Sequence, residues 1–312
     1  MTSVSVPFAE AGPIEQTRAG MLALAEQRLR PLLTQQQETA RHGAGPRPAG
    51  AAEGAGRLGA LFCVSGFLAA GGNPGDPVAV DTCAALELLH LPGRFPGDPA
   101  STHADRLAAR LPAAARTLWN DLRTTPHTAP RAESRTAPDT GPRAQSHTAP
   151  VTGSAPHDSP AAAGSVRRAI HRPLLLGALL GGRPDLSAAF DRYGLALDEA
   201  LRLRDELIAV HGPAPEGTGG PAAPRHSPAL LLAMAAQRSA RAGVLPARAR
   251  NAHTDAALLR RLLDEAGAQA AAERRIAGLV DRACAALATP ALGRPWREEF
   301  TRLATRLAYN GR

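Results

Sequence analysis

The stretch FDRYGLALDEALRLRDELIAVHGP, residues 190–213, has the apolar spacing of an amphipathic helix and contains an Asp-Glu pair, Asp205 and Glu206. Its apolar residues recur at intervals of two to four positions, which favours one long helix over 185–211. These residues are Tyr193, Leu195, Leu197, Leu201, Leu203, Leu207 and Val210. The acidic pair is either a metal-binding pair in a cavity or two charges on a solvated helix face.

The composition indicates an all-α fold. The chain has 312 residues, of which 44% are hydrophobic and 3% aromatic, and Ala and Leu supply most of the apolar content. Ala and Leu favour helices, whereas β-branched and aromatic residues favour strands. No long alternation of apolar and polar residues demands a sheet.

The same periodicity predicts several further helices, separated by Gly- and Pro-rich turns. Pro31 should kink or shorten the first of them, and Thr254 can cap the helix that Gly267 stops. GGNPGDP, residues 71–77, is a strong turn signal. The predicted helical segments are 14–39, 57–70, 78–91, 229–242, 255–266, 269–288 and 295–309, with a further apolar segment around PLLLGALLGG.

Residues 124–164 differ from the rest of the chain, because they are rich in Pro, Thr, Ser and Gly and contain Thr-Ala-Pro three times. Such a segment buries too little apolar surface to offset its ordering entropy. We therefore expect a disordered Pro/Thr/Ala-rich linker between two helical parts of one bundle, at 1–123 and 165–312.

Charge and cysteine content bear on the possible partners. The net charge is +8 and all 36 basic residues are Arg. These Arg residues are mixed with acidic ones and lack interleaved aromatics, so no nucleic-acid partner is expected. The three cysteines show no CxxC spacing and predict neither a disulfide framework nor a zinc site. No leader or membrane span is apparent, and we expect a cytoplasmic protein.

Several stretches together resemble the trans-prenyltransferases, or polyprenyl diphosphate synthases, of the actinobacterial type. CAALELLHL, 83–91, resembles the helix before the first aspartate-rich motif of that family. RPLLLGALLGG, 172–182, followed by residues 190–213, resembles the region of the second motif. LLRRLLDEAGAQAAAERRIAGLVDRACAAL, 258–287, is similar to the C-terminal helices. The resemblance covers most of 50–90 and 165–290.

The resemblance implies an isoprenoid-synthase-like helical bundle around a deep cavity. It also implies the joining of isopentenyl diphosphate to an allylic diphosphate, which ionises to a cation that the alkene attacks. Two aspartate-rich motifs hold Mg²⁺ on the allylic diphosphate in this family. Mg²⁺ prefers oxygen ligands and commonly bridges carboxylates to phosphates, and carboxylates at i and i+4 share one helix face.

The second motif is partly retained. By the resemblance, Asp205 and Glu206 fill its first two acidic positions, whereas Ala209 stands at the third. Leu201 and Arg202 replace the Phe-Gln that precedes the acids in the family. Arg202 is also four residues from Glu206, the spacing of a surface ion pair on a helix.

The other motifs retain less. In FPGDPAS, 95–101, only Asp98 matches an acid of the first motif, and the surrounding Pro and Gly residues should break a helix there. Arg57 is the one residue of the Gly-Lys-Arg segment that remains. Gly220 stands where the family's later loop has Lys. Asp98 and Arg57 are thus candidates for metal and diphosphate binding, with a loop acid and a surface charge as the alternatives.

Three functions remain open. The chain is a degenerate polyprenyl synthase-like subunit that acts as a homodimer or beside an intact prenyltransferase; or an active prenyltransferase with an atypical Mg²⁺ site; or an interaction protein unrelated to isoprenoids. An allylic diphosphate is a possible ligand of the first two. Mg²⁺ is expected as cofactor if the chain is active, and no cofactor otherwise. The fold alone does not decide among these functions.

Overall fold

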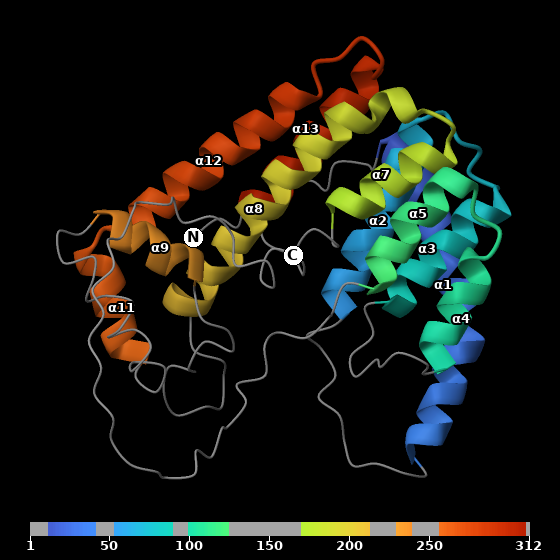
Figure 1. Ribbon diagram of the computed structural model, residues 1–312, viewed down its shortest axis with the longest axis horizontal. Helices are drawn as coiled ribbons and strands as arrows, with labels where there is room; N and C mark the ends of the chain where they lie inside the picture. Colours follow the sequence, from blue (N-terminus) through green and yellow to red (C-terminus); the bar gives the residue numbers. More distant parts are fainter. Residues whose placement is uncertain are drawn as a thin grey trace, which may run out of the picture.

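The computed structural model describes residues 12–41, 53–89, 99–124, 170–212, 229–238 and 256–309, and every regular element in these ranges is helical (Figure 1). The all-α prediction is therefore confirmed for the described ranges. The expected linker, from residue 125 onward, lies outside the described residues. The helices are α1 (Pro13–Arg41), α2 (Glu53–Ala69), α3 (Pro77–Leu89), α4 (Pro99–Ala108), α5 (Ala113–Thr124), α7 (His171–Leu180), the short 3₁₀ helix η1 (Pro184–Leu186), α8 (Ser187–His211), α9 (Ala229–Arg238), α11 (Ala256–Glu265), α12 (Ala268–Ala286) and α13 (Arg294–Tyr309).

Two hydrophobic clusters form the core. One lies among α1–α5 and the other among α8, α9, α11, α12 and α13. Figure 1 shows the first group at one side of the molecule and α8, α12 and α13 running together away from it. Helices α2 and α7 contribute to both clusters: Phe62 and Leu174 to one, Cys63 and Leu176 to the other. This pair of helices therefore joins the two halves.

Glycines allow α2 and α7 to approach closely. A Cβ at Gly177 would lie 2.0 Å from the Cys63 carbonyl oxygen, and one at Gly66 would lie 2.4 Å from the Leu174 oxygen. A Cβ at Gly181 would lie 2.4 Å from the Ala70 Cβ. Since each position faces backbone or a short side chain on the other helix, no rotamer change relieves such a contact.

Aromatic side chains fix α8 between α2 and α13. Tyr193 is fully buried, and its hydroxyl donates a hydrogen bond of 2.9 Å to the Phe300 carbonyl oxygen. Its ring lies 5.4 Å from the Phe300 ring and 6.4 Å from the Phe62 ring. Burial raises the pKa of Tyr193 well above its usual value, so the hydroxyl stays a donor.

Local signals explain some of the helix boundaries. Asp76 accepts hydrogen bonds from the N–H groups of Val78 and Ala79, at 2.7 and 3.1 Å, and so caps α3 after the predicted turn. Gly267 has a φ of 61°, as expected of a glycine that ends a helix. Pro31 does not end α1, which continues to Arg41.

A buried ion pair joins α1 to α13. Arg18 Nη1 lies 2.7 Å from Glu299 Oε1, and the two side chains are 3% and 4% exposed. Arg302 binds the other carboxylate oxygen of Glu299. Both oxygens of the buried carboxylate are therefore paired, as a desolvated charge requires.

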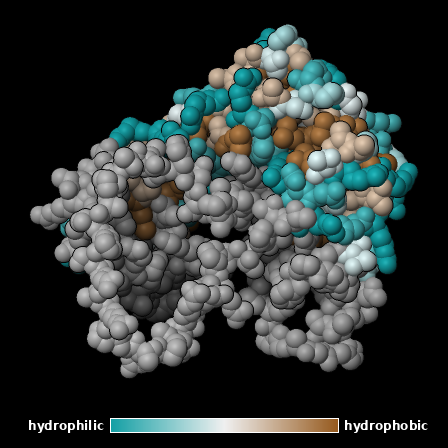
Figure 2. Space-filling view, viewed as in Figure 1, coloured by the Kyte–Doolittle hydropathy of each residue, from teal (hydrophilic) through white to brown (hydrophobic). Residues whose placement is uncertain are grey.

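On the face shown in Figure 2, the described part of the surface carries hydrophilic residues with apolar patches between them. Its large exposed apolar side chains, among the described residues, are Leu24, Ile208 and Tyr309. Within the same ranges, no helix combines the length and the apolar character that crossing a bilayer requires.

We expect Gly177→Ala to lower the free energy of unfolding by about 3 kcal/mol, because the new methyl group meets backbone of α2. Gly278→Ala is the matched control: nothing lies within 4 Å of a Cβ at this exposed position in α12. That change should stabilise the protein by about 0.5–1 kcal/mol. Urea denaturation measures both, and equal effects would refute the close α2–α7 contact.

Candidate functional site

The acidic pair Asp205 and Glu206, which resembles the second motif, lies near the C-terminal end of α8, and its two members have different surroundings. Asp205 is exposed, whereas Glu206 is half-buried. Helices α9 and α11 pack beside this end of α8, as Figure 1 shows. The sequence left open whether the pair lies in a cavity or on a solvated face. Asp205 lies on a solvated face, whereas Glu206 is partly withdrawn from water.

The carboxylate of Glu206 accepts hydrogen bonds from backbone N–H groups at the N-terminus of α9. Oε2 accepts a hydrogen bond of 2.9 Å from the Leu231 N–H, and Oε1 accepts one of 3.3 Å from the Leu230 N–H. Burial raises the pKa of Glu206, while these hydrogen bonds and the charge of Arg202 act in the opposite direction. Burial is the largest of these effects.

Helix α11 also contacts the end of α8. Arg260 Nε donates a hydrogen bond of 2.8 Å to the Val210 carbonyl oxygen, one of the last carbonyls of α8. His211 Nδ1 lies 3.7 Å from Asp264 Oδ1, so the two side chains form an ion pair when the imidazole is protonated. The C-terminal end of α8 is thus held by both α9 and α11.

Arg57 lies elsewhere, at the N-terminal part of α2. It is 72% exposed, and its Nη2 is 3.8 Å from Glu26 Oε1 of α1. Burial raises the pKa of Glu87 on α3, and the charge of Glu26 raises it further, whereas the charge of Arg57 lowers it. Arg57 therefore faces two glutamates, and its role in diphosphate binding stays a prediction.

Asp98 lies outside the described residues, and α4 begins directly after it, at Pro99. Metal binding by Asp205 and Glu206 also stays a prediction. Within the described ranges, no group of three or more His, Cys, Asp or Glu side chains is placed to hold a metal ion.

A buried acid on α8 was not identified from the sequence. Asp198 is 3% exposed, and its Oδ2 accepts a hydrogen bond of 3.2 Å from the backbone N–H of His171, at the start of α7. His171 Nε2 lies 2.6 Å from Asp191 Oδ1. The available signal was the position of Asp198 directly after Leu197 in the apolar pattern. These contacts position α7 on α8.

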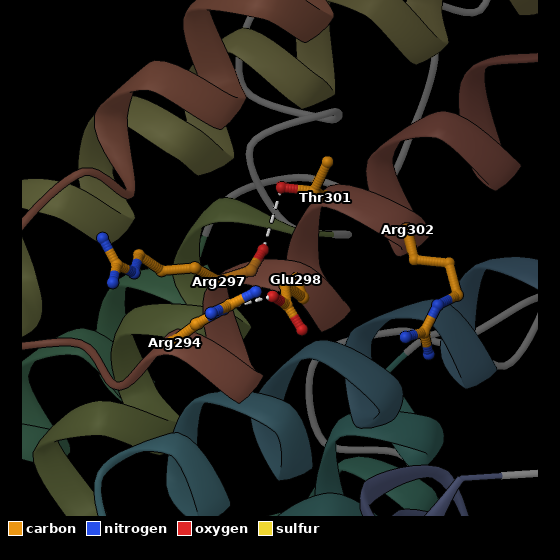
Figure 3. A pocket seen from close by; sticks show the side chains of 5 residues that line it. All are labelled: Arg294, Arg297, Glu298, Thr301 and Arg302. Carbon is orange, nitrogen blue, oxygen red and sulfur yellow. Dashed lines mark hydrogen bonds and ion pairs between the residues drawn. The ribbon is translucent and has the colours of Figure 1, made fainter.

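A second candidate is an open hollow of about 520 Å³ on α13. Figure 3 shows its lining side chains, with Arg302 directed away from Arg297. Arg294 Nε lies 2.7 Å from Glu298 Oε1, and Arg302 binds Glu299. Because all the lining residues come from one helix and two of the three Arg are neutralised, their charges do not converge on one point. The lining residues are Arg294, Arg297, Glu298, Thr301 and Arg302.

No protein-family model matches the sequence. Solved structures with the same arrangement of helices include a geranylgeranyl pyrophosphate synthase from Corynebacterium glutamicum in complex with isoprenyl diphosphate and magnesium. It is 22% identical, with a TM-score of 0.58 over 95% of this chain and 98% of that one. A further geranylgeranyl pyrophosphate synthase has a TM-score of 0.62 at 13% identity, covering 96% and 99% of the two chains.

A polyprenyl synthase from Caulobacter crescentus CB15, in complex with calcium and isoprenyl diphosphate, is also similar. Its identity is 19% and its TM-score 0.58, covering 96% of this chain and 99% of that one. The likeness spans nearly the whole of each chain. The chain therefore has the all-α fold of the polyprenyl diphosphate synthases, as the resemblance implied.

Proposed function

We propose that this chain is a polyprenyl diphosphate synthase-like protein of isoprenoid biosynthesis that acts as a non-catalytic or weakly active subunit. The shared fold supports the first part. The contact of Glu206 with α9 carries the second part, because it engages a carboxylate that the family's second motif uses for metal. In this proposal the metal and diphosphate motifs are degraded, and the scaffold remains.

The ligand class follows from the neighbours. The proteins from Corynebacterium and Caulobacter were solved with isoprenyl diphosphate and a divalent cation. We extend the prenyl diphosphate, as a possible ligand, to this chain. Arg57, Asp98 and the acidic pair are the residues that the resemblance assigns to such a ligand, and the chain has no Lys to assist them.

Magnesium does not fit the acidic pair in the observed arrangement. If Mg²⁺ bound there, Asp205 and Glu206 would be its ligands and it would neutralise diphosphate charge. Both oxygens of Glu206, however, face the N–H groups at the positive N-terminal end of α9, which disfavours a cation there. Among the described residues, no third His, Cys, Asp or Glu side chain completes a metal site with this pair. No catalytic step of the proposal therefore depends on a metal held by α8.

The proposed partner is a second copy of the chain or an intact prenyltransferase. A degraded member retains a useful role if its helices still pack against an active subunit. An active prenyltransferase with an atypical metal site is the alternative, and turnover separates the two.

We expect no elongated product when the purified chain is incubated with labelled isopentenyl diphosphate, geranyl or farnesyl diphosphate, and Mg²⁺. The physical reason is that half of the charges needed to stabilise the leaving diphosphate are missing. Asp205→Ala should be equally inactive, and the Corynebacterium enzyme serves as positive control. Product from the wild type that disappears in Asp205→Ala would contradict the proposal. Co-elution with an intact synthase, detected by size-exclusion chromatography, would support the subunit role.

A further inference from the structure

We propose that Glu206 caps α9 from the neighbouring helix, and that this contact and divalent-cation binding by the Asp205–Glu206 pair exclude each other. The contact thus acts as an autoinhibitory latch: while Glu206 caps α9, no divalent cation binds the acidic pair. This inference rests on the proposed function of that site. The latch explains how an inherited acidic pair can persist in α8 without holding a metal.

The first argument is the need of α9 for acceptors. The first four N–H groups of a helix have no partner within that helix. The first turn of α9 contains no acidic residue. Leu231 is fully buried, so its N–H cannot rely on water. Glu206 supplies acceptors for this N–H and for that of Leu230.

The second argument is electrostatic. The N-terminus of a helix has the effect of roughly half a positive charge, which stabilises a carboxylate and repels a cation. A metal ion at Glu206 would lie against this positive end, beside the N–H groups of Leu230 and Leu231 that point at the carboxylate. Binding of a cation therefore requires α9 to move away from Glu206.

The third argument is the cost of the contact. Glu206 is half-buried beside α9, although a charged carboxylate is better solvated in water. A carboxylate that could turn to water would avoid this desolvation. Helix α9 packs against both α8 and α12, and this packing keeps its N-terminus against the Glu206 carboxylate. Asp205, its neighbour, remains exposed.

The first experiment tests the cap without metal or substrate, so its result is independent of the proposed function. In Glu206→Ala, amide hydrogen exchange of residues 229–238 should be about fivefold faster, which corresponds to the loss of a typical cap. Glu206→Gln keeps an acceptor oxygen and should show a smaller effect. Asp205→Ala is the matched control and should leave this exchange unchanged. Unchanged exchange in Glu206→Ala would overturn the inference.

The second experiment tests mutual exclusion. Leu230→Pro removes one of the two N–H donors at a position in the first helical turn, where proline is tolerated. Leu230→Ala is its control, because it shortens the side chain and keeps the N–H. Mn²⁺ binding is followed by the electron paramagnetic resonance signal of the free ion.

Leu230→Pro should bind Mn²⁺ about fivefold more tightly than Leu230→Ala, a coupling of ordinary size for two linked events. Adding Asp205→Asn should abolish the gain. Should Leu230→Pro fail to fold, the wild type decides: saturating Mn²⁺ must accelerate exchange in α9 by the same linkage. Equal Mn²⁺ affinity in the two Leu230 variants, or Mn²⁺ binding to the wild type that leaves α9 protected, would overturn the latch. Tighter Mn²⁺ binding without turnover leaves the proposed function standing.

Discussion

The rest of the structure depends on the close approach of α2 and α7. Gly66, Gly177 and Gly181 leave no room for a methyl group between the two helices. Both helices supply side chains to both hydrophobic clusters, so this contact fixes one half of the bundle relative to the other. It also explains why glycines occur in otherwise apolar helices, where they are unfavourable on propensity alone.

The position of the acidic pair follows from the same contact. Helix α7 carries His171, whose backbone N–H is bound by Asp198 of α8, and Gly194 allows α8 to lie against it. Helix α8 then extends away from α7 and brings Glu206 to α9. The two ends of α8 thus differ: one is anchored in the core, and the other carries the acidic pair and contacts α9.

Much of the fold could be predicted, because apolar periodicity extends through α8 and α12 and a glycine separates α11 from α12. Helices α4 and α5 were missed. Leu107 is the one large apolar residue of α4, so that helix has no apolar periodicity, and the three of α5 all lie in its last seven residues. The cap of α9 could not be predicted. Its donors are backbone N–H groups, 24 and 25 residues beyond Glu206. Every residue except proline has a backbone N–H, so the sequence does not identify which ones donate to Glu206. The acidic residue alone is equally consistent with a metal ligand and with a solvated charge.

The ion pair of Arg18 with Glu299 has a consequence for synthesis. Its partners are 281 residues apart, yet both are almost fully buried. At ordinary translation rates, on the order of tens of seconds separate their appearance at the ribosome. Burying Arg18 before Glu299 exists would leave a desolvated charge without a partner. Helix α1 therefore takes its final place late, and the nascent chain presents an incomplete helical bundle to chaperones until α13 has been made.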